Sequence, residues 1–390
     1  MSLFIEISHD SLNKFGEELC GDKVEIIRGP DCVTAVLADG LGSGVKANIL
    51  ATLTSKIIGT MLAKGASIDE AVETIANTLP ICKDRGIAYS TFSILQIFNS
   101  GEGYLVEFDN PPVFHFKKGK YCKIKKHNRE INGRYIKESR FTVAPEDVFV
   151  MVSDGAVHAG IGGTLNLGWQ WDNIKEYIER TCKPDTSAKN ISKLLLAVCE
   201  NLYMQKPGDD TTVVAVKVRK PAKVSVMVGP PADRSLDSHV VSKFMSQEGK
   251  KVVCGGTTSQ IVSRVLGREI VTSLKYFSPD IPPTAEIEGI NLTTEGVLTI
   301  GKTLECVKKC MSSQSTLQDL SLLNKQDAVS RLAKMLLVDS TTIHFFVGRA
   351  LNPAHQNPGL PLNLNIKFKL VEEMAECLRS FGKQVITEYY

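Results

Sequence analysis

The chain lacks several features that would point to whole classes of protein. It has 390 residues, and no apolar run approaches the roughly 18–20 residues that a membrane-spanning helix needs. The N-terminus MSLFIEISHDS has no basic stretch followed by an apolar one, so we expect no signal peptide. The formal net charge of +3 is too small for this length to favour nucleic acid or an anionic membrane as a partner.

Closely spaced cysteine pairs are also missing. The ten cysteines include no CxxC pair, and the nearest two, Cys306 and Cys310, stand at helical spacing. In a large chain without an export signal, this pattern predicts reduced and mostly buried thiols. We therefore expect a cytoplasmic protein.

The length favours two domains. Residues 1–219 are rich in short strand signals, with helices expected in pairs at 44–79 and at 173–204. The charged segment 219–223 contains a proline and predicts a boundary between residues 1–220 and 223–390. We expect an α+β fold of two stacked antiparallel sheets flanked by helices, followed by a smaller α/β domain.

Three short acidic motifs stand where predicted strands begin or end. They are Asp39-Gly40 in VLADGLGSG, Asp154-Gly155 in VMVSDGA and Asp209-Asp210 in GDDTTVVAV. Carboxylates brought together on rigid strand ends would repel one another unless cations lay between them. Hard divalent ions prefer such oxygen ligands, and two of them can activate a water that attacks phosphorus. The motifs therefore predict a two-metal hydrolytic site.

Each motif alone has a plainer interpretation. A DGxG turn is commonly a capped loop, and the glycines at 40–44 could form a dinucleotide-binding loop. The GxGxxG spacing is missing, and Asp39 would repel a pyrophosphate. The three motifs in this order favour the metal site, while a nucleotide-binding enzyme stays an alternative.

The set of motifs resembles the metal-dependent serine/threonine protein phosphatases, the PPM family, and within it the bacterial branch typified by stage II sporulation protein E. The resemblance covers residues 1–219. The matching segments are Gly21-Asp22 in CGDKVEII, Asp39-Gly40, Asp154, Asp209, RGIAYSTFSIL at 85–95 and NPP at 110–112. It implies an αββα four-layer sandwich with two Mn²⁺ or Mg²⁺ ions at one end.

The resemblance also implies residue roles. Asp39 would bridge both metals, the Gly40 carbonyl would bind one, and Asp154 and Asp209 would hold the second. Two outer carboxylates would lie beside this set, Asp22 holding water and Asp210 as a neighbour. Leu41 follows Gly40 where many relatives have a histidine, so no general acid is assigned. In the sporulation-type relatives the helices corresponding to 44–79 act as a regulatory switch; simple packing is the alternative here.

The functional expectation is hydrolysis of a phosphomonoester on a bacterial signalling protein by a metal-activated water. An anti-sigma-factor antagonist is the substrate that the resemblance favours. The alternative is a catalytically weak pseudophosphatase that acts as a ligand- or partner-binding module. Residues 223–390 match no family that we can name, and we hypothesise a sensing or docking role with a small ligand there. A homodimer is a further hypothesis.

Overall fold

The computed structural model describes residues 3–78, 90–131, 134–183, 186–272, 281–312, 314–350 and 366–390. The chain divides into two compact units, Met1–Lys220 and Pro221–Tyr390. Residues 85–89 of the segment quoted above lie outside the described residues. No helix in the described parts is long and apolar enough to cross a membrane.

The first sheet of the N-terminal unit has six antiparallel strands. β3 pairs along its whole length with β4 and over residues 33–39 with β2, which makes it a central strand. In spatial order the strands are β2 (Asp22–Arg28), β3 (Cys32–Gly40), β4 (Ser90–Phe98), β5 (Glu102–Phe108), β9 (Arg134–Thr142) and β8 (His127–Ile131).

The second sheet has five antiparallel strands, with β11 between β1 and β10. Its β6 and β7 form an antiparallel hairpin. In spatial order the strands are β1 (Phe4–Leu12), β11 (Thr211–Arg219), β10 (Val148–Val152), β6 (Phe114–Lys117) and β7 (Lys120–Tyr121).

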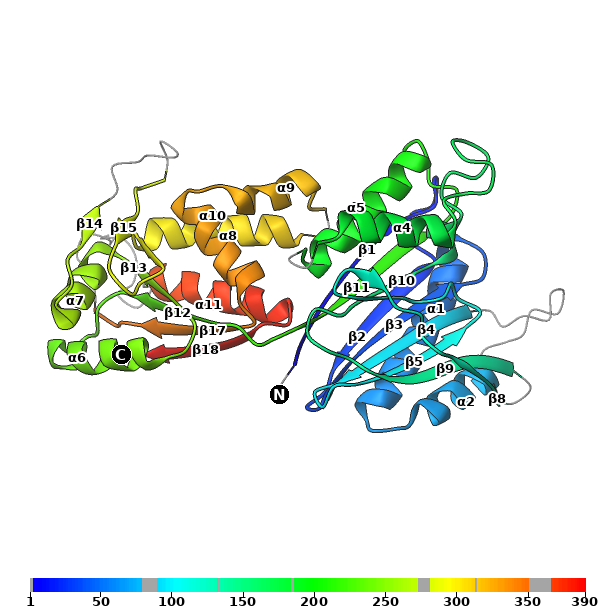
Figure 1. Ribbon diagram of the computed structural model, residues 1–390, viewed down its shortest axis with the longest axis horizontal. Coiled ribbons are helices and arrows are strands. Elements are labelled where there is room, and N and C mark those ends of the chain that lie inside the picture. The colour runs from blue at the N-terminus through cyan, green and yellow to red at the C-terminus, as the bar shows by residue number, and fades with distance from the viewer. Residues whose placement is uncertain are drawn as a thin grey trace. The chain divides into compact units, whose positions relative to one another are not determined.

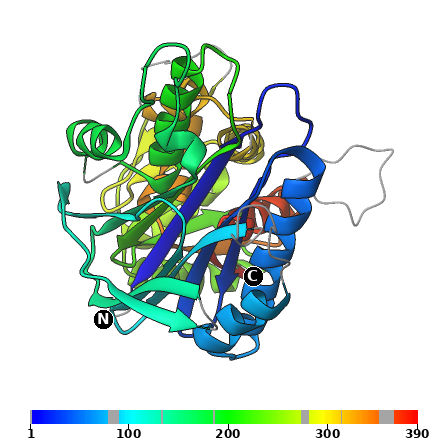
Figure 2. The ribbon, with the colours of Figure 1, turned by 90° about the vertical axis from the view of Figure 1, so that its right-hand side faces the viewer.

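Three apolar layers join the two sheets and their helices into an αββα sandwich (Figures 1 and 2). Alternate residues of each strand face opposite ways, so one face of each sheet can pack against the other sheet. Leu37 of β3 and Phe149 of β10 both belong to the apolar layer between the sheets. Helices α1 (Gly44–Ala63) and α2 (Ile68–Thr78) cover the six-stranded sheet, and α4 (Trp171–Thr181) and α5 (Ala188–Leu202) cover the other. The expected four-layer fold is confirmed.

The start of α2 shows how local sequence sets these elements. The Glu70 side chain accepts from the backbone N–H of Ser67 at 2.7 Å, and the Glu70 N–H donates back to the Ser67 hydroxyl at 3.1 Å. This reciprocal pair is a capping box, which satisfies N–H groups that an α-helix leaves without partners at its first turn.

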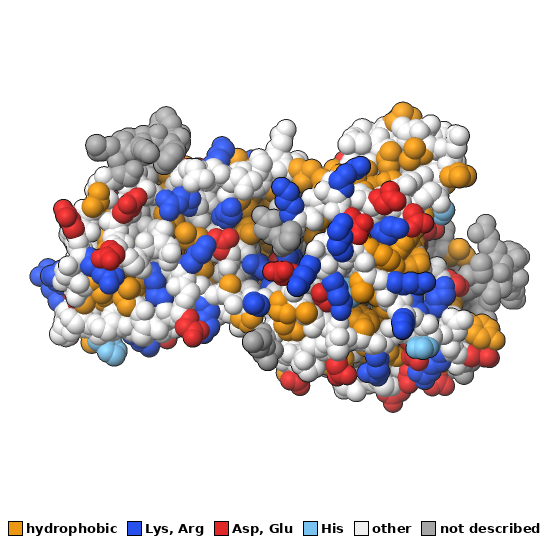
Figure 3. Space-filling view, viewed as in Figure 1, with side chains coloured by type: hydrophobic (Ala, Val, Ile, Leu, Met, Phe, Trp, Pro, Cys, Tyr) orange, Lys and Arg blue, Asp and Glu red, His pale blue; other side chains and the backbone are white. Residues whose placement is uncertain are grey.

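On the face drawn in Figure 3, acidic and basic side chains of the N-terminal unit are mixed.

The C-terminal unit is the expected smaller α/β domain. Its seven-stranded sheet has five parallel strands in the spatial order β16, β13, β12, β17, β18, with β14 and β15 added antiparallel beyond β16. The strand bounds are β12 (Lys223–Val228), β13 (Lys250–Cys254), β14 (Val271–Thr272), β15 (Ala285–Glu286), β16 (Leu292–Thr294), β17 (Thr342–Val347) and β18 (Gln384–Tyr389).

Helices cover both faces of this sheet, as parallel strands require. One apolar cluster joins the sheet to α6 (Asp237–Ser246) and α7 (Gly256–Leu266). The other joins it to α8 (Val297–Met311), α10 (Ala328–Lys334) and α11 (Ile366–Ser380). Shorter elements are the helices α3 (Asp154–Val157) in the N-terminal unit and α9 (Leu317–Ser321), the 3₁₀ turns Arg234–Leu236 and Leu322–Asn324, and a π-helical turn Met335–Asp339.

The core between the two sheets predicts a clear stability effect. Leu37 is fully buried there, and Leu37→Ala removes apolar contacts and leaves a cavity. We expect the free energy of unfolding of the N-terminal unit to fall by about 2–5 kcal/mol, measured by urea denaturation. Tyr135→Ala is the control, because Tyr135 is 67% exposed, and its effect should stay below about 0.5 kcal/mol. Equal losses in both variants would contradict this assignment of the core.

Candidate metal centre

Strand alternation directs two predicted carboxylates into the space between the sheets. Ala35 and Leu37 of β3 belong to the inter-sheet core, so Asp39, two residues on, faces the same way. Asp22 stands directly opposite Asp39 in the β2–β3 register, and opposite residues of an antiparallel pair share a face. Asp22 and Asp39 therefore lie side by side at one end of the sandwich.

The second sheet brings its own acidic motifs to the same end. Val214 of β11 belongs to the inter-sheet core, so Thr212 and Asp210 continue its face. The Thr212 N–H donates to the Ser153 hydroxyl at 2.8 Å, and the Ser153 N–H donates to the Thr212 carbonyl at 3.0 Å. These bonds hold the end of β10 against the start of β11. Asp154 follows as the first residue of α3, and Asp209 precedes Asp210.

The electrostatics indicate that these carboxylates interact. Burial raises the pKa of Asp39 to about 10, and the negative charges of Asp22, Asp154 and Asp209 contribute to the rise. Burial also raises the pKa of Asp209, with Asp154 as the next cause. The structure thus brings Asp39, Asp154 and Asp209 from three separate parts of the sequence into one electrostatic cluster, with Asp22 beside them.

Asp22 and Asp210 are the most buried members of the cluster. Burial raises the pKa of Asp22 to about 7; the nearby hydroxyls of Ser153 and Thr212 oppose the rise. Neither hydroxyl forms a hydrogen bond of normal geometry with Asp22, since both Asp22 oxygens are buried without a partner. Asp210 accepts a hydrogen bond from the Lys14 N–H at 3.0 Å through Oδ1, while its buried Oδ2 has no partner.

The glycines of two motifs are required by close backbone approach. A Cβ added to Gly40 would lie 2.1 Å from the Ala47 carbonyl oxygen in α1. A Cβ added to Gly155 would lie 2.1 Å from the Asp210 carbonyl oxygen. Neither position has room for a side chain, so each Asp-Gly pair combines a carboxylate with a tightly packed backbone.

The donor set fits a hard divalent cation. It consists of carboxylate oxygens, and a cation among them would offset the mutual repulsion that contributes to their raised pKa values. The outer carboxylates Asp22 and Asp210 also have buried oxygens without a partner. Among the described residues, no three His, Cys, Asp or Glu side chains already surround one point as metal ligands would. Like charges with no cation between them are expected to stay apart, so the metal-ligand assignments stay a prediction that this geometry supports.

Sequence reasoning missed three residues of the site. Ser153 and Thr212 stand next to the predicted aspartates within the same motifs, and their alternation with core residues could have shown that they face the site. Lys14 contributes only a backbone N–H, and no sequence pattern indicates that contact.

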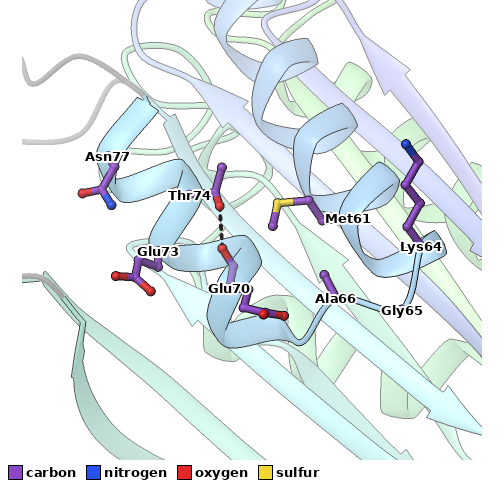
Figure 4. Close-up of a pocket in the computed structure, with 8 residues that line it drawn as sticks. All are labelled: Met61, Lys64, Gly65, Ala66, Glu70, Glu73, Thr74 and Asn77. Carbon is purple, nitrogen blue, oxygen red and sulfur yellow. Dashed lines mark hydrogen bonds between the residues drawn. The ribbon is translucent and has the colours of Figure 1, made fainter.

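A separate hollow of about 630 Å³ lies between the C-terminal end of α1 and the side of α2, along which its lining reaches from Glu70 to Asn77 (Figure 4). It contains none of the predicted ligands. Since α1 starts just after Asp39 and is 20 residues long, the two ends of the helix are about 30 Å apart. The residues that line the hollow are Met61, Lys64, Gly65, Ala66, Glu70, Glu73, Thr74 and Asn77.

The sandwich with acidic strand ends is the architecture of a PPM-type phosphatase domain. Residues 29–219, just under half of the chain, match the model of the family "Stage II sporulation protein E (SpoIIE)". The N-terminal unit therefore contains a SpoIIE-like segment of the PPM phosphatase family. No curated protein matches the chain.

Solved structures of this fold resemble the chain at low identity. One holds the PP2C phosphatase domain and a regulatory fragment of SpoIIE from Bacillus subtilis, with 20% identity and a TM-score of 0.48; the match covers 56% of this chain and 64% of that one. The RsbU and RsbW domains of a Mycobacterium tuberculosis protein match with 16% identity and a TM-score of 0.48, over 62% and 68% of the two chains. RsbX in complex with magnesium matches with 20% identity and a TM-score of 0.40, over 55% and 95%.

The raised pKa of Asp39 predicts how the metal-free protein responds to pH. The folded state keeps a proton on Asp39 up to about pH 10, whereas the unfolded state releases it near the ordinary value of 3.8. The folded state therefore binds more protons between these values, and its stability falls as pH rises. Asp39→Asn removes this contribution, so we expect the melting temperature in EDTA at pH 8 to rise by several degrees and to depend less on pH.

Glu286→Gln removes an exposed carboxylate of the C-terminal unit and serves as the control, with no expected change. Differential scanning calorimetry from pH 5 to pH 9 measures both variants. A melting temperature of Asp39→Asn at or below that of the wild type at pH 8 would show that Asp39 is not destabilised by its neighbours.

Proposed function

We propose that the chain is a metal-dependent serine/threonine phosphoprotein phosphatase of a bacterial signalling pathway. The observation that supports this most directly is the group of interacting carboxylates at one end of the sandwich, where burial, and after it the charges of Asp22, Asp154 and Asp209, raise the pKa of Asp39. Such repulsion is costly in a folded protein unless a cation offsets it when the protein works. The SpoIIE-like family match agrees with this chemistry.

Each residue has a proposed role. Asp39 and the Gly40 carbonyl, with Asp154 and Asp209, would hold two Mn²⁺ or Mg²⁺ ions. When bound, such ions lower the pKa of a water molecule and stabilise the negative charge that develops on phosphoryl oxygens. The unpartnered oxygens of Asp22 and Asp210 would accept hydrogen bonds from water held at the site and so orient it for attack.

The leaving group needs a proton from another source. Leu41 follows Gly40 and carries no proton to donate, so solvent would protonate the departing serine or threonine oxygen. The alkoxide of an alkyl phosphate leaves poorly without a proton, whereas an aryl phosphate has a better leaving group. We therefore expect aryl phosphates to be usable test substrates even without a general acid.

The proposed substrate is a phosphorylated regulator, such as an anti-sigma-factor antagonist, and the proposed location is the cytoplasm. Structures that resemble this chain are described as a cell fate determinant and as RsbU and RsbW domains, which are regulatory settings. The nine cysteines within the described residues are free thiols, which is usual in a reducing compartment.

Helix α1 is proposed to regulate the site. Ala47 in its second turn lies against Gly40, and Met61 and Lys64 at its other end line the hollow shared with α2. A partner that bound in the hollow and displaced α1 would therefore move the Gly40 backbone beside Asp39.

The activity itself is tested by hydrolysis of p-nitrophenyl phosphate with added Mn²⁺. We expect Asp39→Asn and Asp209→Asn to lower kcat/KM by about 100-fold or more, because each removes a charge that holds the metals. Asp22→Asn should cost about 10–100-fold, as loss of an outer-sphere partner does. Glu286→Gln is the matched control and should keep full activity.

Three other outcomes are informative. Wild-type activity that is the same in EDTA would contradict the metal mechanism. Mn²⁺ binding by calorimetry without any hydrolysis, also of a phosphoserine protein, would favour the pseudophosphatase alternative. If the protein neither binds Mn²⁺ nor hydrolyses a phosphate ester, the phosphatase proposal is wrong.

The α1 contact gives a further prediction. Gly40→Ala places a methyl group where the Ala47 carbonyl lies, which forces α1 away from β3. We expect at least a tenfold weaker Mn²⁺ affinity by calorimetry. Gly163→Ala is the control, because the nearest atom to its Cβ would be the Met204 methyl at an ordinary 3.4 Å. Unchanged affinity in Gly40→Ala would show that α1 and the metal centre are not coupled.

A further inference from the structure

Two helices of the C-terminal unit begin in the same way. α7 follows Gly255 and α8 follows Gly296, and each has a threonine as its third residue, Thr258 in α7 and Thr299 in α8. Both threonines are almost fully buried. This repeated Gly-x-x-Thr arrangement belongs to no role described so far.

The sheet brings the two helix starts together. β13 and β16, which lead into α7 and α8, are neighbouring parallel strands with Cys254 opposite Thr294. The Gly255 N–H donates to the Thr294 carbonyl at 2.8 Å, and a Cβ added to Gly296 would lie only 3.4 Å from the Gly255 Cα. The helices then leave on opposite faces, α7 packing with Val253 and α8 with Cys254.

The paired helix starts present unsatisfied donors and positive potential. The first turn of an α-helix has N–H groups without partners inside the helix. Neither α7 nor α8 has a side-chain cap or an acidic residue in its first turn. The two macrodipoles add a partial positive charge at the same place, which favours an anion.

A buried hydroxyl gives independent support. Thr299 is fully buried and its Oγ1 has no hydrogen-bond partner, which is uncommon in folded proteins. The Cα–Cβ bond of a helical residue leans towards the helix N-terminus, so the Thr299 side chain extends from the third residue of α8 back towards the start of that helix. The Oγ1 of Thr293, the middle residue of β16, is also buried and unpartnered.

We propose that the N-termini of α7 and α8 bind the phosphoryl group of a small metabolite. The backbone N–H groups of both first turns and the Thr299 hydroxyl would surround the phosphoryl oxygens. Glu295 is exposed in the loop between β16 and α8 and is the acidic residue of the loops that precede the two helices. It would repel a second phosphate but accept hydrogen bonds from hydroxyl groups, so the ligand class is a sugar monophosphate or nucleoside monophosphate.

The test uses the full chain in EDTA, with binding measured by calorimetry for inorganic phosphate, ribose 5-phosphate and ribose. We expect ribose 5-phosphate to bind more tightly than phosphate, and ribose not to bind. Thr257 is an exposed residue of the first turn of α7. Thr257→Glu adds a negative charge that suits the helix dipole but repels the ligand, so affinity should fall at least tenfold. Thr257→Gln is the neutral control and should change it less than about twofold.

Thr299→Val separates binding from folding. It removes an unpartnered hydroxyl and keeps the shape of the side chain, so the melting temperature without ligand should stay the same or rise. Affinity for ribose 5-phosphate should nevertheless fall. A lower melting temperature with unchanged affinity would show that Thr299 is structural and would overturn the proposal.

Two controls keep this site distinct from the metal centre. Asp39→Asn should leave phosphate binding in EDTA unchanged; loss of binding in that variant would assign the anion to the N-terminal unit and overturn the proposal. Failure of both phosphate and ribose 5-phosphate to bind at about 10 mM would also overturn it, because that concentration corresponds to very weak affinity. Neither result depends on phosphatase activity.

Discussion

The repulsion among carboxylates at the end of the sandwich is the constraint on which the N-terminal unit depends. Asp39 and Asp22 are neighbours by strand register, and they cannot separate without breaking the β2–β3 ladder. Asp154 and Asp209 are fixed by the other sheet, which the apolar core between the sheets holds in place. The fold therefore stores an electrostatic cost that a bound cation can relieve. Stability and metal affinity should be linked through the same side chains.

The same arrangement explains the tight packing around the site. A ligand set works only if its members are held in fixed positions, and here the supports are mostly backbone. Gly40 lies against α1, and Gly155 lies against the residue that precedes β11. The Ser153–Thr212 hydrogen bonds join the two strands next to Asp154 and Asp210. A displacement in any of these elements would reach the carboxylates directly.

Much of this could be predicted from sequence because the signals are local. The Asp-Gly pairs stand at the ends of clearly apolar strands, and the Ser67–Glu70 capping box is readable in four residues. The local signal of β1 is only the alternation of Ile5 and Ile7 with polar residues, and its pairing with the distant strand β11 is not readable from sequence. β8 and β9 have a weak strand signal because their sequences are strongly polar. The contact of Lys14 with Asp210 depends on such long-range pairing and has no local signal.

The two units place ligand-binding groups at strand ends by different means. In an antiparallel sheet, neighbouring strands run in opposite directions, so the end of one strand lies beside the start of the next. Asp39 near the end of β3 therefore lies opposite Asp22 at the start of β2. In a parallel sheet every strand ends at the same edge and leads into a helix, so that edge collects helix N-termini. The antiparallel sandwich brings negative side chains together, which favours a bound cation. The parallel sheet brings backbone N–H groups together, which favours a bound anion. Gly255 fits the second case, because its φ of +117° disfavours a side chain and an added Cβ would lie 3.1 Å from the Thr258 hydroxyl at the start of α7.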